Sequence, residues 1–183
     1  FNGMREEAFP GEDRAIVPSP RVSSYDEAPE MSAPGIADKV EKAVAAGTYD
    51  LILLNFANPD MVGHTGNVEA TIKACEATDR AIGQVVDAAL AVGGAVLVTA
   101  DHGNAEEVKN LISGEIDKEH STNPVPFIVI AKSFEGLRAP TGDVLGGDLS
   151  LSQPVGMLAD VAPTVLKLLE IPQPADMTGQ ALI

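Results

Sequence analysis

The chain has 183 residues, which is enough for one domain with a sizeable core and too few for two domains of ordinary size. Its net charge of −15 argues against a partner nucleic acid or an anionic membrane surface, because binding polyanions requires clustered Lys and Arg. A single cysteine, Cys75, and the absence of an apolar stretch long enough to cross a bilayer favour a cytoplasmic protein.

The expected helices follow an N-terminal arm. Residues 1–34 are rich in Pro, Gly and Ser, which excludes a long helix and predicts an extended arm ahead of an α/β core over residues 35–183. Amphipathic spacing and stop signals predict helices over residues 33–46, 68–90 and 156–170. Ser32 is expected to begin the first helix and Gly47 to end it.

Three short apolar runs predict buried strands, over residues 49–56, 95–99 and 125–130. Strands that alternate with helices indicate a three-layer α/β sandwich with a mainly parallel sheet. In such sheets ligands gather at the carboxyl ends of the strands. Asp60 and Asp101 follow the first two strands, and His120 lies on a loop long enough to reach the same edge.

All three histidines of the chain lie in loops with acidic or small polar neighbours. His64 follows Asp60, His102 follows Asp101 directly, and His120 precedes the third strand. Imidazole and carboxylate together form a ligand set that suits Zn, Mn or Fe, so we expect these five residues to bind metal. The alternative is three unrelated histidines of the surface or core.

The local sequence suggests how these residues are presented. Pro59, Gly63 and Gly66 disfavour a helix, so Asp60 and His64 are expected on a tight loop. Five ligands are too many for one open metal site and too few for two, which predicts two metals with ligands missing from this chain. The neighbouring polar residues expected to orient the imidazoles are Asn104, Ser121, Thr122 and Asn123.

Several segments carry a resemblance to a known family. The most specific are Asp60-Met-Val-Gly-His64-Thr-Gly66 and Pro29-Glu-Met-Ser-Ala33, whereas the Asp-His-Gly of residues 101–103 and the Asp-x-x-Pro-Thr of residues 160–164 are shared more widely across a superfamily. On these motifs the chain resembles the C-terminal part of the cofactor-independent phosphoglycerate mutases, which belong to the alkaline phosphatase superfamily. The resemblance covers essentially all 183 residues.

This resemblance implies a site and an activity. Asp60, His64 and His120 would bind one Mn²⁺, and Asp101 with His102 would bind a second. In the family the second metal also needs an Asp and the nucleophilic Ser of an N-terminal segment, and a middle domain orients the substrate. None of these is in this chain, so it is expected to be the C-terminal part of a metal-binding phosphatase-type domain and to be inactive by itself.

The intact enzyme would be a cytoplasmic, monomeric isomerase of glycolysis. It would interconvert 3-phosphoglycerate and 2-phosphoglycerate through a phosphoserine. Within this chain Ser121 and Thr122 lack an evident activating base, so neither is expected to be the nucleophile. The alternatives are another phosphomutase or phosphohydrolase of the superfamily, and a metal-binding fragment without catalysis.

Overall fold

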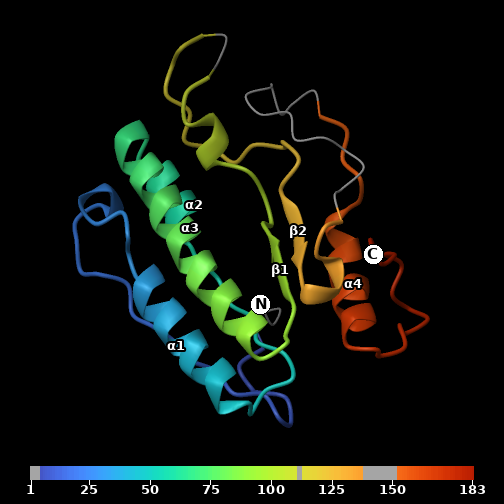
Figure 1. The fold of residues 1–183 in the computed structure, drawn as a ribbon. Coiled ribbons are helices and arrows are strands. Elements are labelled where there is room, and N and C mark those ends of the chain that lie inside the picture. The colour runs from blue at the N-terminus through green and yellow to red at the C-terminus, as the bar shows by residue number, and fades with distance from the viewer. Residues whose placement is uncertain (1–4, 111–112, 138–151) are drawn as a thin grey trace.

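A computed structural model describes residues 5–110, 113–137 and 152–183 (Figure 1). Its helices are α1 (Ala33–Ala46), α2 (Asn58–Gly63), α3 (Val68–Ala91) and α4 (Val161–Leu168), and its strands are β1 (Val96–Thr99) and β2 (Phe127–Ile130). Single 3-10 turns occur at Tyr25–Glu27, Ala105–Glu107, Lys132–Phe134 and Leu158–Asp160. None of the helices in these ranges is long and apolar enough to cross a membrane.

The first predicted helix is confirmed as α1. It ends where expected, because Gly47 takes a left-handed conformation with φ of 62° and its N–H bonds to the Val44 carbonyl. Ser32 is the N-cap residue, as expected, but its side chain makes no capping bond, because its hydroxyl donates to the carbonyl of Pro18 at 2.7 Å. That bond fastens the described part of the arm, which forms no α-helix, to the start of α1.

The long helix α3 is also confirmed, and a row of alanines forms most of its buried face. Its buried residues are Ala70, Thr71, Ala74, Ala77, Ala81, Val85 and Ala89. Ile72, a large apolar residue of the same helix, is 54% exposed instead. Small side chains on the buried face allow neighbouring helices to approach α3 closely.

Two helices pack on different parts of this face. Near its middle and C-terminal half, α3 contributes Ala81 and Val85 to a core with Ala37 and Val40 of α1. At its N-terminal end, Ala70 and Ala74 form a second core with Val62 of α2, which is completely buried. Figure 1 shows α1 running alongside α3. Thus α3 fixes the position of α2, which carries Asp60 and His64.

The tight loop expected around Asp60 and His64 is wrong, because residues 58–63 form the helix α2. Pro59 lies in its first turn, where a backbone N–H would have no helical partner, so the proline costs little. Gly63 lies at the last position, and Gly66 turns the chain afterwards with φ of 75°. The predicted breakers therefore limit the length of the helix without preventing it.

The described residues do not form the mainly parallel sheet that the sequence predicts. Strands β1 and β2 match the second and third predicted strands, but they pair antiparallel, with Val96 opposite Ile130 and Thr99 opposite Phe127. In Figure 1 this pair runs between α3 and α4. Apolar runs predict burial but not direction, and direction was inferred from the alternation of helices and strands.

The first predicted strand has no paired partner among the described residues. Residues 51–57 belong to no assigned helix or strand, and alternate side chains, Ile52, Leu54 and Phe56, pack on the core between α1 and α3. Leu51 and Leu53 are 56% and 66% exposed on the other side. The segment thus has the two-residue period of a strand with one face covered.

The last predicted helix is divided into a 3-10 turn and α4, with Pro163 tolerated in the first turn of α4. Asp160 is 6% exposed, and its carboxylate accepts the N–H groups of Met157 at 2.7 Å and Gln180 at 2.8 Å. The Thr164 hydroxyl donates to the Asp160 carbonyl and accepts the N–H of Leu182. The Asp and Thr of this motif therefore fasten the C-terminal segment to α4.

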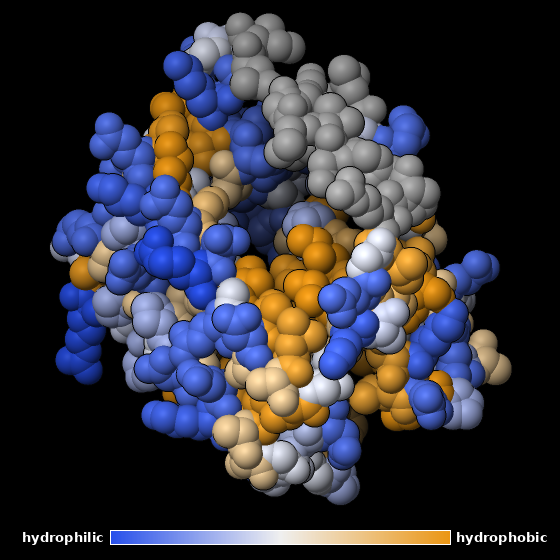
Figure 2. Space-filling model, viewed as in Figure 1, coloured by the Kyte–Doolittle hydropathy of each residue, from blue (hydrophilic) through white to orange (hydrophobic). Residues whose placement is uncertain are grey.

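Figure 2 shows apolar side chains gathered in the middle of the face that contains the strand pair. Several large apolar residues near this pair are exposed, among them Ile128, Val155, Met157 and Leu158. Apolar surface of this kind is typical of a face that another part of a protein covers.

Asp160 gives a testable dependence of stability on pH. Hydrogen bonds from the Gln180 and Met157 backbone hold the pKa of its carboxyl below the ordinary value of about 3.9. Its stabilising effect is therefore complete above the unfolded pKa and disappears as the pH falls through the lower, folded pKa. We expect Asp160→Asn to be less stable than the unsubstituted chain at neutral pH and the difference to shrink in acid, measured by urea unfolding from pH 7 to 2. A difference that grows in acid would contradict this.

Candidate metal centre

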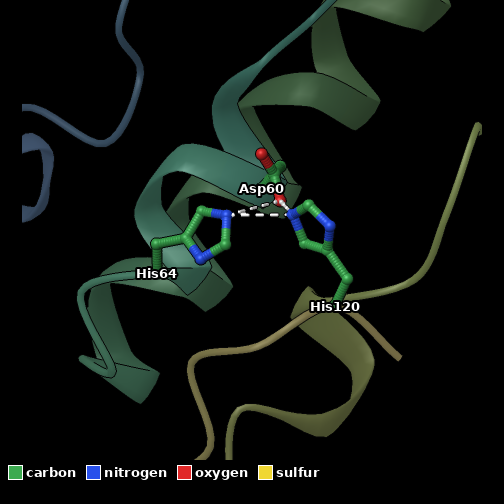
Figure 3. Close-up of side chains that lie close together, drawn as sticks. All are labelled: Asp60, His64 and His120. Carbon is green, nitrogen blue, oxygen red and sulfur yellow. Dashed lines mark hydrogen bonds and ion pairs between the residues drawn. The ribbon is translucent and has the colours of Figure 1, made fainter.

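Three of the predicted metal ligands converge in the structure (Figure 3). Asp60 and His64 lie four residues apart, so helix α2 presents both on one side, and His120 reaches them from the loop before β2. Oδ1 of Asp60 lies 3.2 Å from Nε2 of His64 and 3.2 Å from Nε2 of His120. The two Nε2 atoms are 3.0 Å apart.

These distances suit a single ion. Ligand atoms that each lie about 2.0 to 2.2 Å from a metal are separated by roughly 3 Å when they meet it at right angles. Within the described ranges, these three residues are the one group of His, Cys, Asp or Glu side chains close enough to share an ion. The donor set of two imidazoles and one carboxylate is that of common transition-metal sites.

The His64 ring is oriented by the backbone. Its Nδ1 atom lies 2.6 Å from the carbonyl oxygen of Lys118. A carbonyl oxygen can only accept, so Nδ1 is the nitrogen that donates, and in the neutral ring the lone pair is then on Nε2, the atom that faces Asp60 and His120. Metal-binding histidines are commonly fixed in this way through their second nitrogen.

The other two predicted ligands lie beside this group and do not join it. The His102 ring stacks on the His120 ring, with centroids 3.7 Å apart and planes inclined by 18°. Asp101 has a side chain that is 85% exposed, and its Oδ1 is 3.7 Å from Nε2 of His102. The structure therefore brings His102 to the edge of the centre and leaves Asp101 open to solvent.

Close backbone contact holds the two histidine loops together. The N–H of Ser121 donates to the carbonyl of Gly103 at 2.8 Å, which forms an isolated antiparallel bridge. A Cβ atom at position 103 would lie 2.2 Å from both Glu106 Oε1 and Ser121 Oγ, so a larger residue there would displace these two side chains. Because β2 starts beside the end of β1, the His120 loop reaches the Asp101 loop from a neighbouring strand.

Of the predicted orienting residues, Asn104 contacts the centre directly. It is buried and donates from Nδ2 to Oδ1 of Asp60 at 2.8 Å. Ser121 and Asn123 instead donate to Glu106. Glu106 was missed as a site residue, and only its place in the Asp-His-Gly-Asn-Ala-Glu motif could have indicated it.

Glu106 is held as a carboxylate. Partial burial by itself would raise the pKa of this carboxyl, but hydrogen bonds from Ser121 and Asn123 and from backbone N–H groups outweigh that effect. The pKa of Glu106 is lowered as a result, and the group is ionised at neutral pH.

The chain belongs to the Metalloenzyme superfamily, whose family model matches residues 1–173. It is 50% identical over 183 residues to the 2,3-bisphosphoglycerate-independent phosphoglycerate mutase of Rhodopseudomonas palustris. It is 51% identical over 183 residues to the enzyme of the same name from Thermosynechococcus vestitus. Both matches cover 100% of this chain and 33% of the relative, so the chain spans about a third of the length of these curated relatives.

A solved structure is also similar. It is a crystal structure of Leishmania mexicana phosphoglycerate mutase at low cobalt concentration, with a TM-score of 0.70 and 31% sequence identity. The match covers 90% of this chain and 30% of that protein. Together with the family match, it supports the predicted alkaline phosphatase-like type of fold.

The geometry of α2 makes a prediction about Gly63. A Cβ atom there would lie 2.4 Å from Asn104 Oδ1, whereas a Cβ at Gly83 of α3 would have nothing within 4 Å. We expect Gly63→Ala to lower the free energy of unfolding by about 1–3 kcal/mol, because α2 and Asn104 must move apart. Gly83→Ala is the control and should raise it by up to about 1 kcal/mol through helix propensity. Urea unfolding measures the free energy of unfolding of both variants. Equal changes in the two would exclude the close contact between Gly63 and Asn104.

Proposed function

We propose that this chain carries most of the metal ligands of a 2,3-bisphosphoglycerate-independent phosphoglycerate mutase, an isomerase that interconverts 3-phosphoglycerate and 2-phosphoglycerate. The observation that carries this proposal is the extent of the similarity. About 50% identity to enzymes of this name runs through all 183 residues. That stretch contains the converged side chains of Asp60, His64 and His120.

We assign Asp60, His64 and His120 to one divalent ion and Asp101 with His102 to a second. The spacing of the first three side chains supports the first assignment. For the second ion, the proximity of His102 to this group and the exposure of Asp101 fit a site whose remaining ligands come from elsewhere in a longer polypeptide. We propose Mn²⁺ for both, although the same donors would also accept Zn²⁺, Co²⁺ or Fe²⁺.

The bound ions would supply positive charge that neutralises a phosphoryl group and activates a hydroxyl nucleophile. We assign that nucleophile to a serine outside this chain, which would take the phosphoryl group and return it to the neighbouring oxygen of the glycerate. The residues of this chain prepare the centre. The bond from His64 Nδ1 to the Lys118 carbonyl turns Nε2 toward the centre, where the neutral ring would offer its lone pair, and helix α2 holds Asp60 beside it.

The domain proposed here is a phosphatase-type domain of which this chain is the C-terminal part, with residues 1–34 as an arm and 35–183 as α/β core. In the complete domain, residues 51–56 would be a strand of a mainly parallel sheet within a three-layer sandwich. The alternation of covered and exposed side chains along this segment supports that reading. A cavity of about 670 Å³ beside it, lined by Ile36 and Val40 of α1 and by Leu51 and Leu53, leaves room for a further element.

The cellular setting follows from the same assignment. We propose that the intact enzyme is a cytoplasmic monomer of glycolysis whose partner is the small phosphoglycerate substrate. The acidity of the chain supports the expectation that nucleic acids and anionic membranes are not partners.

Metal binding provides the first test. We expect the 183-residue chain to bind one Mn²⁺ tightly and any second ion much more weakly, since only the first group of ligands is assembled. His64→Ala should weaken the tight site by more than about 100-fold, because it removes a direct ligand. His102→Ala, the matched control, should leave that site within a few fold. Calorimetric titration measures the Mn²⁺ affinity of the unsubstituted chain and of both variants. Two equally tight sites in the unsubstituted chain would contradict the assignment.

Catalysis provides the second test. We expect a longer polypeptide that contains this chain and the remaining two thirds found in its relatives to convert 3-phosphoglycerate to 2-phosphoglycerate in an enolase-coupled assay with Mn²⁺. The 183-residue chain alone should be inactive, because the assigned serine is absent. Full activity of the chain alone would overturn this view. A longer polypeptide that only hydrolyses phosphate esters would move the assignment to a phosphohydrolase.

A further inference from the structure

Behind the three converged side chains, hydrogen bonds connect Asn104 and Glu106 to both segments that carry them. We propose that Asn104 and Glu106 are positioning residues of the metal centre, which hold the Asp60 carboxylate and the His120 imidazole at the spacing that one ion requires. This inference rests on the proposed metal centre and adds to it two residues that are not ligands.

Asn104 restricts the orientation of the Asp60 carboxylate. Its Nδ2 donates to Oδ1 of Asp60 at 2.8 Å, and this is the same oxygen that lies 3.2 Å from both imidazole nitrogens. A carboxylate can rotate about its last bond, and a donor on one oxygen restricts that rotation. Asn104 is only 5% exposed, so water has little access to compete for this bond.

The orientation of the Asn104 amide is determined by its surroundings. Its Oδ1 atom is buried without a hydrogen-bond partner among the described residues and faces the backbone of Gly63. Turning the amide over would place Oδ1 against the Asp60 carboxylate, where two acceptors would repel each other. The orientation described here therefore keeps the amide donor on Asp60 and leaves Oδ1, beside Gly63, as the atom without a described partner.

Glu106 connects the two loops. One oxygen, Oε2, accepts the backbone N–H of Asn104 at 2.8 Å. The other, Oε1, accepts from the hydroxyl of Ser121 and from Nδ2 of Asn123 at 3.1 Å. Ser121 follows His120 directly in the chain. Through charge-assisted hydrogen bonds, the Glu106 carboxylate therefore fixes the position of two backbone segments. One segment carries Asn104 and the other carries His120.

Glu107 offers a matched comparison in the same 3-10 turn. Among the described residues, its carboxylate accepts from Asn123 alone, at 3.2 Å, and bonds to neither Asn104 nor Ser121. Glu106→Gln and Glu107→Gln make the same change of charge at adjacent positions. In Glu106→Gln, the amide that replaces the carboxylate can keep one acceptor but presents N–H groups where a second acceptor was needed.

The test is calorimetric titration of the full 183-residue chain with Mn²⁺ alone, with folding of each variant checked by circular dichroism. We expect Glu106→Gln and Asn104→Asp to bind the ion about 10- to 100-fold more weakly at unchanged stoichiometry, the usual effect of removing an orienting partner. Glu107→Gln should bind within about threefold of the unsubstituted chain. Equal affinities of the two Glu variants would overturn the positioning role.

A second readout does not require metal. In NMR spectra of the metal-free chain, Glu106→Gln should shift the ring resonances of His120, whereas Glu107→Gln should leave them in place. Unchanged His120 resonances in Glu106→Gln would overturn the inference even if the metal centre is correct. Failure of the unsubstituted chain to bind Mn²⁺ would overturn the centre itself and the positioning role with it. If Glu106→Gln does not fold, Ser121→Ala takes the place of that variant in both measurements, because it removes one of the same hydrogen bonds.

Discussion

The close packing of small residues along α3 is the constraint on which the rest of the structure depends. Alanines at its N-terminal end allow α2 to pack against it with Val62 fully buried, and those farther along do the same for α1. Larger side chains would hold these helices farther away. Because α2 is anchored through Val62, the neighbouring positions Asp60 and His64 lie at the helix surface and face the histidine loops.

The centre itself depends on three backbone segments that approach one another more closely than side chains would normally permit. Gly63 makes room for the Asn104 amide, and Gly103 makes room for Glu106 and Ser121. Close approach then allows short polar side chains to connect the segments directly, without long flexible residues that would lose more entropy. A site built in this way is ordered before an ion binds, which lowers the cost of binding.

The convergence of Asp60, His64 and His120, with Asp101 and His102 outside their group, reflects how the chain is folded. Asp60 lies in α2 and His64 caps the C-terminal end of that helix, and His120 comes beside them because β2 begins where β1 ends. The Asp101 side chain is 85% exposed after the end of β1, and the His102 ring stacks on the His120 ring. The exposed leucines of residues 51–53 and the cavity beside them lie on a face that the described residues also leave open.

The sequence by itself determined the helices α1 and α3, the places of β1 and β2, and the five residues with metal-binding chemistry, because these depend on local periodicity, capping residues and side-chain type. It also determined the family resemblance, which is carried by short motifs. It did not determine the helical presentation of Asp60 and His64, since Pro59 and Gly63 are compatible with both a loop and a short helix. It missed Glu106, whose bonds to Asn104 and Ser121 join residues of separate loops. The antiparallel pairing, the alanine packing face and the spacing of the three ligand atoms were decided only in the tertiary structure, because each depends on contacts between segments far apart in the chain, which local sequence patterns do not specify.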